Sequence, residues 1–410
     1  MLAAAAAHAA LDLPAVGDQT KTAVIYLDHN ATSPLLPEAR VAWLDAAEKF
    51  PGNPSSPHRL GARAEQALDD ARARLAAVLD CAAHDIVWTS GATESCNAAL
   101  HHAATAAVAR DAADSTAPVW LSAIEHPAVL AAARHFFRER VQLIPVTRHG
   151  VVDLDWLATQ LAAGRLRPAL VAVMAANNET GVLQPWREAQ ALCAARGVAF
   201  FCDATQWCGR LPAHGLGAAD FIAGSAHKFG GPRGVGFLKC PPGAAPRPLL
   251  HGGKQQEGRR AGTENLPGIL ATVAALEWCE RQIIAGESAR RHAVRDRFER
   301  ELCAALPSVA INGLGPDAGV ERLWNTVNVV MPESDCRVRW VVKLDKAGFA
   351  VSTGSACASG SEEPSHVLTA MGLAPSEAAR VLRFSAGWLT PETAWDELCG
   401  ALGRIHGELV

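Results

Sequence analysis

Lys228 stands at the point where an apolar run gives way to a turn rich in glycine. Residues 220–224 are typical of the end of a buried strand, and five glycines lie within the thirteen residues 224–236. A lysine in such a place loses solvation, which lowers the pKa of its amine and favours the neutral, nucleophilic form. That amine could form a Schiff base with an aldehyde cofactor. A lysine on an exposed glycine loop would have similar neighbours, so Lys228 needs partners before it indicates catalysis.

Three further residues match the needs of one aldehyde cofactor, pyridoxal phosphate. Its pyridine nitrogen requires a carboxylate, which keeps the ring protonated so that it can accept electrons. Asp203 ends an apolar run twenty-five residues before Lys228, and Gln206, three residues later, could donate to the phenolic oxygen of the ring. His126, which follows another apolar run, could stack on the face of the ring.

The phosphate of such a cofactor requires backbone N–H and hydroxyl donors, which a helix N-terminus provides. The segment SGATES (residues 90–95) places Ala92 and Thr93 where a strand gives way to a helix, and Ser225 and His227 could add donors. Each feature has an ordinary structural alternative, since S-G-A-T can simply cap a helix. Their order along the chain, taken together, indicates a cofactor site.

Apolar runs that alternate with helical patterns must position these residues. Continuous apolar strands with helices between them are typical of an α/β fold whose parallel sheet is covered on both faces. Ligands bind to such sheets where the carboxyl ends of the strands open into loops. Polar residues end or directly follow each strand-like run, which predicts one shared pocket. The runs are residues 85–90, 118–124, 169–176, 198–203 and 220–225.

The last third of the chain has the pattern of a second lobe. A long charged helix near residues 278–304 is expected to cross into it, ahead of a strand at 325–331 and a segment at 338–361. The chain has 410 residues, which is long enough for two lobes.

Composition narrows the partners and the compartment. A net charge of −4 at pH 7 gives no support for a nucleic-acid or membrane-surface role. No charge-free stretch of about 20 apolar residues occurs, as a membrane-spanning helix would need. Eleven cysteines without a C-x-x-C pair argue against a disulfide framework and a zinc site. We therefore expect reduced thiols, no bound metal and a cytoplasmic location.

Several short motifs occur together along the chain. They are GNPSSPH (52–58), TSGATES (89–95), EHPAVL (125–130), ANNETGV (176–182), DATQ (203–206), SAHK (225–228), GRRAGTEN (258–265), STGSACASGSEEPSHVL (352–368) and RFS (383–385). With them, from about residue 26 to residue 392, the chain resembles the cysteine desulfurases of the NifS/IscS type. These are pyridoxal-phosphate enzymes of the class V aminotransferase family.

The resemblance implies fold type I of the pyridoxal-phosphate-dependent transferases. This is an α/β fold in which helices cover a mostly parallel seven-stranded sheet in a large domain, next to a smaller α+β C-terminal domain. We expect the domains to divide as follows: a flexible extension at 1–24, a segment joining the small domain at 25–40, the cofactor-binding large domain at 41–277, and the small domain with the cysteine loop at 278–410.

The resemblance also implies roles for individual residues. Lys228 would hold the internal aldimine and shuttle the α-proton, while His126 would stack on the ring and assist acid–base steps. Asp203 would pair with the pyridine nitrogen and Gln206 with the phenolic oxygen. The phosphate would be bound by Ala92, Thr93, Ser225 and His227, joined by Thr263 of the partner subunit in a homodimer. Asn178, at the cofactor, would orient the substrate with Arg383, which would grip its α-carboxylate in a bidentate manner.

Cys357 is the second candidate nucleophile. Small residues and two glycines flank it in STGSACASGS (352–361), which indicates an accessible thiol on a loop, whereas structural cysteines usually have apolar neighbours. The resemblance implies that its thiolate attacks the sulfur of the L-cysteine substrate, becomes a persulfide and leaves L-alanine. The persulfide would serve an acceptor protein, such as an iron–sulfur scaffold or a thiolation carrier.

Other activities remain open at this stage. A selenocysteine lyase or another class V aminotransferase would use the same cofactor, although transamination needs no thiol. A catalytically idle scaffold for sulfur-transfer partners is the alternative from another class. One departure from the family pattern is Gln256, which stands where the family usually has an acid, and we expect it to change local contacts and not the chemistry. Cys208, close to Asp203 in sequence, could have a packing or a redox role.

Overall fold

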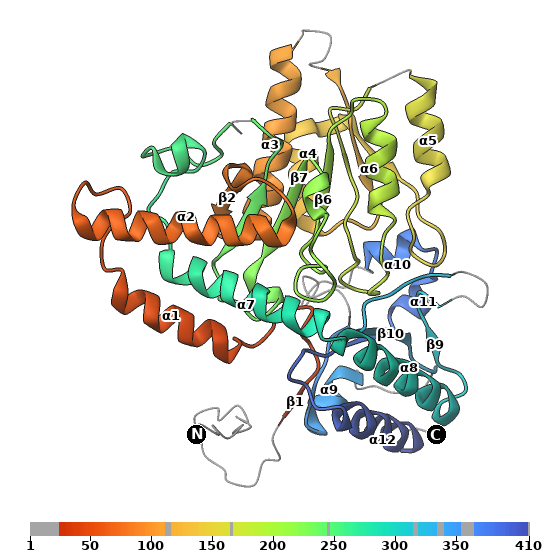
Figure 1. Cartoon of the computed structure of the whole chain (residues 1–410). Helices are drawn as coiled ribbons and strands as arrows, with labels where there is room; N and C mark the ends of the chain where they lie inside the picture. Colours follow the sequence, from red (N-terminus) through yellow and green to blue (C-terminus); the bar gives the residue numbers. More distant parts are fainter. Residues whose placement is uncertain are drawn as a thin grey trace.

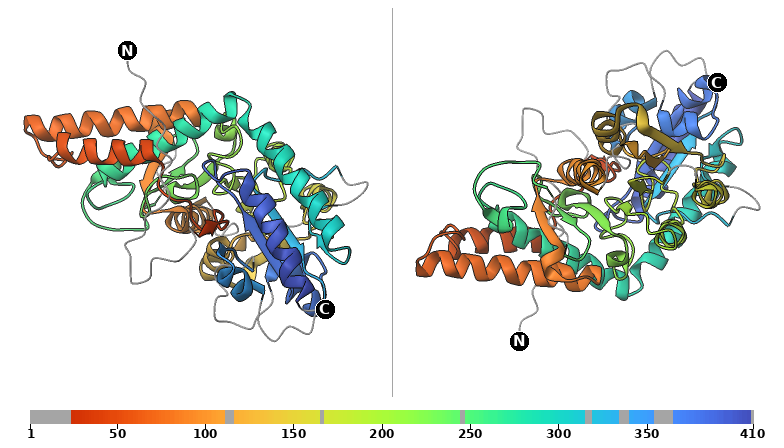
Figure 2. Two further views of the ribbon diagram at one scale, coloured as in Figure 1. Left: turned by 90° about the horizontal axis from the view of Figure 1, so that it is seen from below. Right: turned by 90° about the horizontal axis from the view of Figure 1, so that it is seen from above.

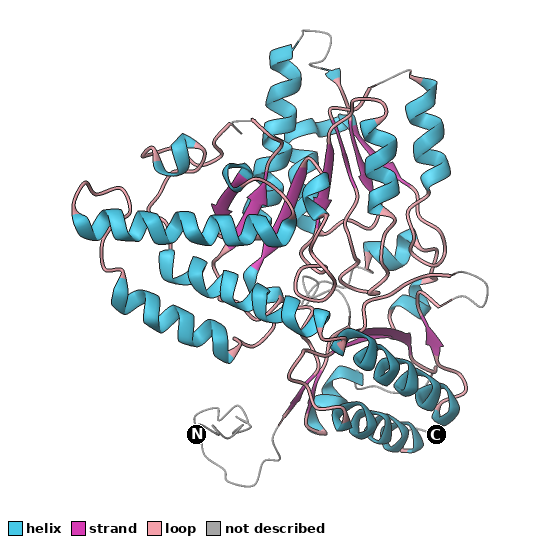
Figure 3. Cartoon of the chain, viewed as in Figure 1, coloured by secondary structure: helices cyan, strands magenta, loops and turns pink. Residues whose placement is uncertain are grey.

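The structure is a computed structural model that describes residues 24–110, 116–164, 167–243, 247–314, 319–333, 340–353 and 365–408. A large α/β region contains a seven-stranded sheet with helices on both sides, and a smaller region is formed mainly by the C-terminal part of the chain (Figures 1 and 3). The extension expected at 1–24 lies almost wholly outside the described residues, as does Cys357.

The central sheet has the strand order β2-β8-β7-β6-β5-β3-β4. β8 runs antiparallel to both of its neighbours and the other pairings are parallel, so the prediction of a mostly parallel sheet is confirmed. The strands, in sheet order, are Ile86–Thr89, Gly236–Lys239, Phe221–Ser225, Phe200–Asp203, Leu170–Ala172, Val119–Ser122 and Val141–Ile144. Because β8 lies between β2 and β7, these two strands still point in the same direction. The five apolar runs identified in the sequence all contain strands, whereas β4 and β8 were not among those runs.

Alternate residues of the strands pack on opposite faces of the sheet. Ile222 belongs to the core on one face, with α2 (Arg59–Leu79), α5 (Leu154–Ala163), α6 (Trp186–Ala194) and α7 (Leu266–Ile284). Phe221 and Ala223 belong to the core on the other face, with α3 (Ala92–Arg110) and α4 (Pro127–Phe137). This burial on both faces explains why the strands are continuously apolar. α1 (Pro37–Lys49) packs against α7.

The C-terminal region is built around a three-stranded antiparallel sheet in the order β12-β10-β9. Its strands are Val381–Ser385, Thr326–Val330 and Ala310–Ile311, and β1 (Ile25–Tyr26) pairs with β11 (Phe349–Ala350). α8 (Glu287–Ala305) packs against α12 (Thr393–Gly407), at the opposite end of the molecule from α1 and α2 (Figure 2). The short helices are α9 (Trp340–Lys346), α10 (His366–Ala370) and α11 (Pro375–Ala378).

The single helix expected near 278–304 is wrong, because two helices occupy that stretch. α7 ends at Ile284 and α8 begins at Glu287. Gly286 between them has φ of 82°, a left-handed conformation that glycine adopts without steric cost. The helical pattern continues across this break, which is why the sequence alone suggested one helix.

Among the described residues, no helix is both long enough and apolar enough to cross a membrane. The same part of the chain holds no cluster of three or more His, Cys, Asp or Glu that could bind a metal ion.

Candidate active site

A cavity of about 400 Å³ opens at the carboxyl edge of the central sheet. Its volume falls within the range of small-molecule sites. Nine of the twelve residues proposed from the sequence line it: Ala92, Thr93, His126, Asn178, Asp203, Gln206, Ser225, His227 and Lys228. The strand-end rule therefore brought together residues from five separate loops.

Lys228 follows β7 in a short 3₁₀ turn, Ala226–Lys228. Its Nζ donates to the carbonyl oxygens of Asn30 and Ala31, each at 2.8 Å. Burial lowers the pKa of the amine to about 8, and the nearby cations Arg210 and Arg383 act in the same direction. Near neutral pH this amine can therefore lose and regain a proton.

Asp203 and Gln206 lie on the loop that follows β6. Asp203 is 5% exposed, and its Oδ1 accepts from the backbone N–H of Thr205 at 2.9 Å. Gln206 uses its Nε2 to donate to the carbonyl oxygen of Asn30 at 3.1 Å. Gln206 Oε1 and Thr205 Oγ1 are buried without a hydrogen-bond partner in the described part of the chain. Since both residues line the cavity, these two atoms are suited to meet a polar ligand.

The N-terminus of α3 forms one wall of the cavity. The helix begins at Ala92, and the backbone N–H groups of its first turn have no acceptor within the helix. Gly91, just before it, has φ of 156°, and a Cβ at that position would lie 3.5 Å from Ser225 Oγ. The close approach of these two segments leaves backbone and hydroxyl donors facing one space, which suits an anion such as phosphate.

Two histidines of the cavity are disposed to remain neutral. His126 caps α4, and its Nδ1 accepts from the N–H of Ala128 at 3.1 Å. Burial lowers the pKa of His126, against the opposite effect of Asp203. His227 Nδ1 lies 3.1 Å from Thr32 Oγ1, and burial lowers the pKa of His227 to about 4.

Arg383 lies beside this cavity and does not line it. The residue is 1% exposed, and its Nη1 donates to the carbonyl oxygen of Asn178 at 3.0 Å. Its Nη2 forms an ion pair with Asp28 Oδ1 at 2.6 Å. Asp28 was not identified from the sequence, because the contact joins residues 355 positions apart.

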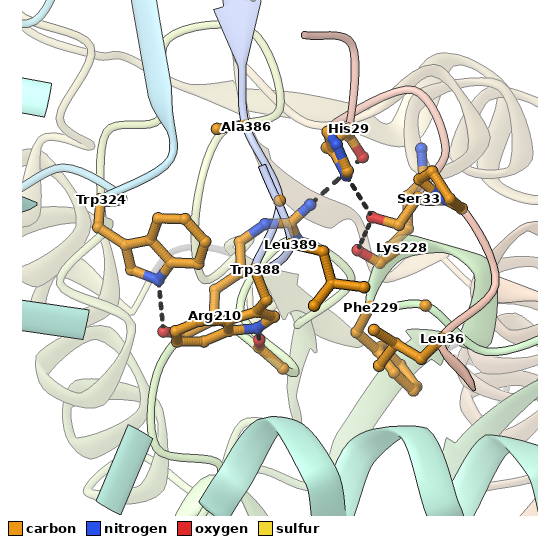
Figure 4. A pocket seen from close by; sticks show the side chains of 14 residues that line it. His29, Ser33, Leu36, Arg210, Lys228, Phe229, Trp324, Ala386, Trp388 and Leu389 are labelled. Carbon is orange, nitrogen blue, oxygen red and sulfur yellow. Dashed lines mark hydrogen bonds between the residues drawn. The ribbon is translucent and has the colours of Figure 1, made fainter. Parts of the chain in front are cut away.

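Lys228 also lines a second, smaller cavity of about 60 Å³, together with Trp324 and Trp388 (Figure 4). Arg210 lines it and is 3% exposed. Its guanidinium donates to the neutral oxygens Gln206 O at 3.1 Å, Asn30 Oδ1 at 3.4 Å and His29 O at 3.5 Å. Burial lowers the pKa of Arg210 to about 10. The charge of this guanidinium adds to burial in lowering the pKa of the Lys228 amine.

Asn30 connects these elements and was also missed. Its carbonyl accepts from Lys228 and Gln206, and its amide Nδ2 donates to Asn178 O at 3.1 Å and Thr326 Oγ1 at 2.9 Å. The only sign of it in the sequence is its place in the YLDHNAT run at 26–32.

Thr263 and Cys357 are the two remaining proposed residues. Thr263 is exposed and does not line the cavity of its own chain. Cys357 lies in residues 354–364, outside the described residues. Of the described residues on either side of that stretch, Ser352 pairs with the backbone of Arg383, and Ser365 Oγ donates to Glu179 Oε2 at 2.6 Å. Cys208 is fully buried with a raised thiol pKa, which favours the packing role.

Comparison with known proteins places this geometry in context. The family model Aminotransferase class-V matches residues 25–394. A cysteine desulfurase of Klebsiella pneumoniae is 39% identical over 389 residues, which cover 94% of this chain and 93% of that protein. A solved structure described as a NifS-like protein has a TM-score of 0.82 at 28% identity, covering 94% of this chain and all of its own. The NifS-like protein from Rickettsia africae has a TM-score of 0.79 at 29% identity, covering 94% and 99%.

Proposed function

The chain belongs to the class-V aminotransferase family, and on this premise we propose that it is a cysteine desulfurase that uses pyridoxal phosphate. It takes sulfur from L-cysteine, leaves L-alanine and carries the sulfur as a persulfide on Cys357. The observation that carries the proposal is the Lys228 amine, which has a lowered pKa and lines one cavity with Asp203 and His126. A cysteine desulfurase needs such an amine for its cofactor and substrate.

The residues of the cavity fit pyridoxal phosphate. Asp203 would face the pyridine nitrogen, while the first turn of α3, Ser225 and His227 would hold the phosphate. The partnerless buried atoms Thr205 Oγ1 and Gln206 Oε1 fit a polar ligand of this kind. When bound, the cofactor supplies an aldehyde that condenses with amines and a ring that takes up electrons from the α-carbon.

The residues of the chain divide the remaining work. Lys228, with its pKa about 8, accepts the α-proton of cysteine and returns a proton to the product. His126 stays neutral and is available for acid–base assistance. We assign Arg383 to the substrate α-carboxylate on the family resemblance; in this structure its guanidinium is buried beside the cavity, where it bonds to the Asn178 carbonyl and Asp28.

Sulfur transfer needs no further oxidant or reductant. The Cys357 thiolate forms a bond to the sulfur of cysteine as the bond between that sulfur and Cβ breaks. The electron pair of the broken bond stays with the carbon skeleton, which takes up protons and becomes alanine. One cysteine and one thiol thus give one alanine and one persulfide, which passes its outer sulfur to an acceptor protein.

Two variants test this assignment. We expect Lys228→Ala to lose the absorbance of lysine-bound cofactor together with alanine formation. We expect Cys357→Ala to keep that absorbance and to stop sulfide release from cysteine. Normal turnover of cysteine by Cys357→Ala would contradict the persulfide mechanism. Amino transfer to a 2-oxo acid in place of sulfide release would favour the aminotransferase alternative.

We also propose a homodimer in which Thr263 binds the cofactor phosphate of the partner subunit. Thr263 is exposed and away from its own cavity. Val41, Trp43 and Leu44 on the outer face of α1 are 67%, 40% and 57% exposed, which is typical of a surface that a second copy covers.

Mixed dimers test this arrangement. In a dimer of wild type with Lys228→Ala, only the wild-type chain holds the cofactor covalently. Adding Thr263→Ala to the Lys228→Ala chain should weaken cofactor binding by the wild-type chain. Adding Thr263→Ala to the wild-type chain itself should leave that binding unchanged. A fully active monomer in solution would contradict the proposal.

A further inference from the structure

Gln256 makes an unusual contact with the edge of the central sheet. Its Oε1 accepts from the backbone N–H of Trp88 at 2.7 Å, and its Nε2 donates to the backbone C=O of Trp88 at 2.9 Å. Trp88 is in β2, the outermost strand of the sheet, so its outward backbone groups have no neighbouring strand. The primary amide of glutamine carries one donor group and one acceptor, like a peptide unit, and therefore continues the ladder by one pair.

This contact holds a backbone segment that is otherwise unfavourable. Gln256 and Glu257 have φ of 49° and 62°, and Gly258 follows with φ of 79°. Two successive non-glycine residues in the left-handed region are uncommon and persist only where the surroundings fix them. Gln256 is 8% exposed and its side chain joins the turn to the sheet, while Arg259 Nη1 donates to the carbonyl of His84 just before β2.

Three further contacts hold the rest of this segment in place. Arg260 forms two hydrogen bonds with Glu94 of α3, at 2.9 and 3.2 Å. Gln255 Oε1 accepts from the N–H of Gly262 at 3.0 Å. Asn265 caps α7 by accepting from the N–H of Gly268 at 3.1 Å. Thr263, exposed between these fastened residues, is therefore presented at a defined place on the surface.

We propose that Gln256 is a positioning residue, whose double hydrogen bond to Trp88 sets the place from which Thr263 reaches the cofactor phosphate of the partner subunit. The inference rests on the proposed homodimer. A carboxylate at position 256 could accept from the Trp88 N–H but could not donate to the Trp88 carbonyl.

The test is Gln256→Glu in the mixed dimer, read as the dissociation constant of pyridoxal phosphate. Placed on the Lys228→Ala chain, the substitution should weaken cofactor binding at the wild-type chain by about ten-fold, the effect of one lost charged hydrogen bond. Placed on the wild-type chain itself, it should leave that affinity unchanged. Gln255→Glu is the matched control, because Gln255 uses only its acceptor oxygen and a carboxylate keeps that bond.

The outcomes separate the inference from the proposed function. If Thr263→Ala weakens binding across the dimer and Gln256→Glu does not, Gln256 does not position Thr263. If the two effects multiply when combined on one chain, Gln256 acts through another route and the inference is wrong. If Thr263→Ala itself has no effect across the dimer, the proposed role of Thr263 fails instead. Gln256→Ala, which adds no charge, replaces Gln256→Glu if that variant does not fold, with the same expectations.

Discussion

The charge environment of Lys228 can be tested on the protein without its cofactor. The pKa of the amine falls from 10.5 to about 8, and burial is the largest cause, followed by Arg210 and Arg383, against Asp203 and Asp28. At pH 8 about half of the molecules would carry a neutral amine, against about 0.3% for an ordinary lysine. This difference is the reason why Lys228 can act as a nucleophile.

Arg210→Met removes one of these cations from a buried place. Because burial contributes more than Arg210, we expect the midpoint of Lys228 to rise by about one pH unit, less than half of the whole shift. Arg210→Lys keeps the charge and should keep the midpoint near pH 8.

The assay is competitive acylation of the apoenzyme between pH 6 and 11. Mass spectrometry follows the Lys228 peptide, with the exposed Lys49 as internal reference. A wild-type midpoint above pH 10 would refute the argument from burial. Equal midpoints in wild type and Arg210→Met would refute the role of Arg210.

Three further predictions concern stability, each measured by urea unfolding at equilibrium. Burial raises the pKa of Glu280 to about 7, which costs stability above pH 7 and not below about pH 4.5. Glu280→Gln should therefore stabilise the protein by about 1–2 kcal/mol at pH 8, after allowance for the partial exposure of the side chain. An equal gain at pH 4 would contradict this cause. Glu299 accepts two hydrogen bonds of 2.7 Å from Arg322 in the C-terminal region, so Glu299→Gln should lower the free energy of unfolding by about 3–5 kcal/mol. Removal of the exposed Lys49–Asp45 pair should lower it by less than about 1 kcal/mol. Equal losses for the two pairs would contradict this reasoning. A Cβ on Gly224 would lie 2.2 Å from the Phe237 ring, so Gly224→Ala should destabilise the protein by about 1–3 kcal/mol. A Cβ on Gly403 in α12 would meet no atom within 4 Å, so Gly403→Ala is the control and should not destabilise it.

The sequence predicted those parts of the site that local pattern determines. Asp203 and Lys228 each follow a short apolar run, and the ends of parallel strands must meet at one edge of the sheet. β8 was missed because GFLK, only four residues long, follows the same glycine-rich turn and has no boundary signal of its own. The break at Gly286 was missed because polar residues continue on both sides of it.

Long-range contacts could not be predicted from pattern. Asn30 meets Lys228 across 198 residues of chain and Arg210 across 180, and neither residue type indicates such a partner. Arg210 in particular resembles a surface arginine until its burial is known. The role of Thr263 came from the resemblance alone, and that of Cys357 from the resemblance together with its small neighbours; both stay predictions.

The most direct test of the account is the mass of the Cys357 peptide after the holoenzyme meets one equivalent of L-cysteine without a reductant. The account predicts one added sulfur atom on Cys357 in the wild type, alongside one alanine, and none in Lys228→Ala. Alanine formed with no sulfur on Cys357, or a persulfide formed equally well without Lys228, would contradict it.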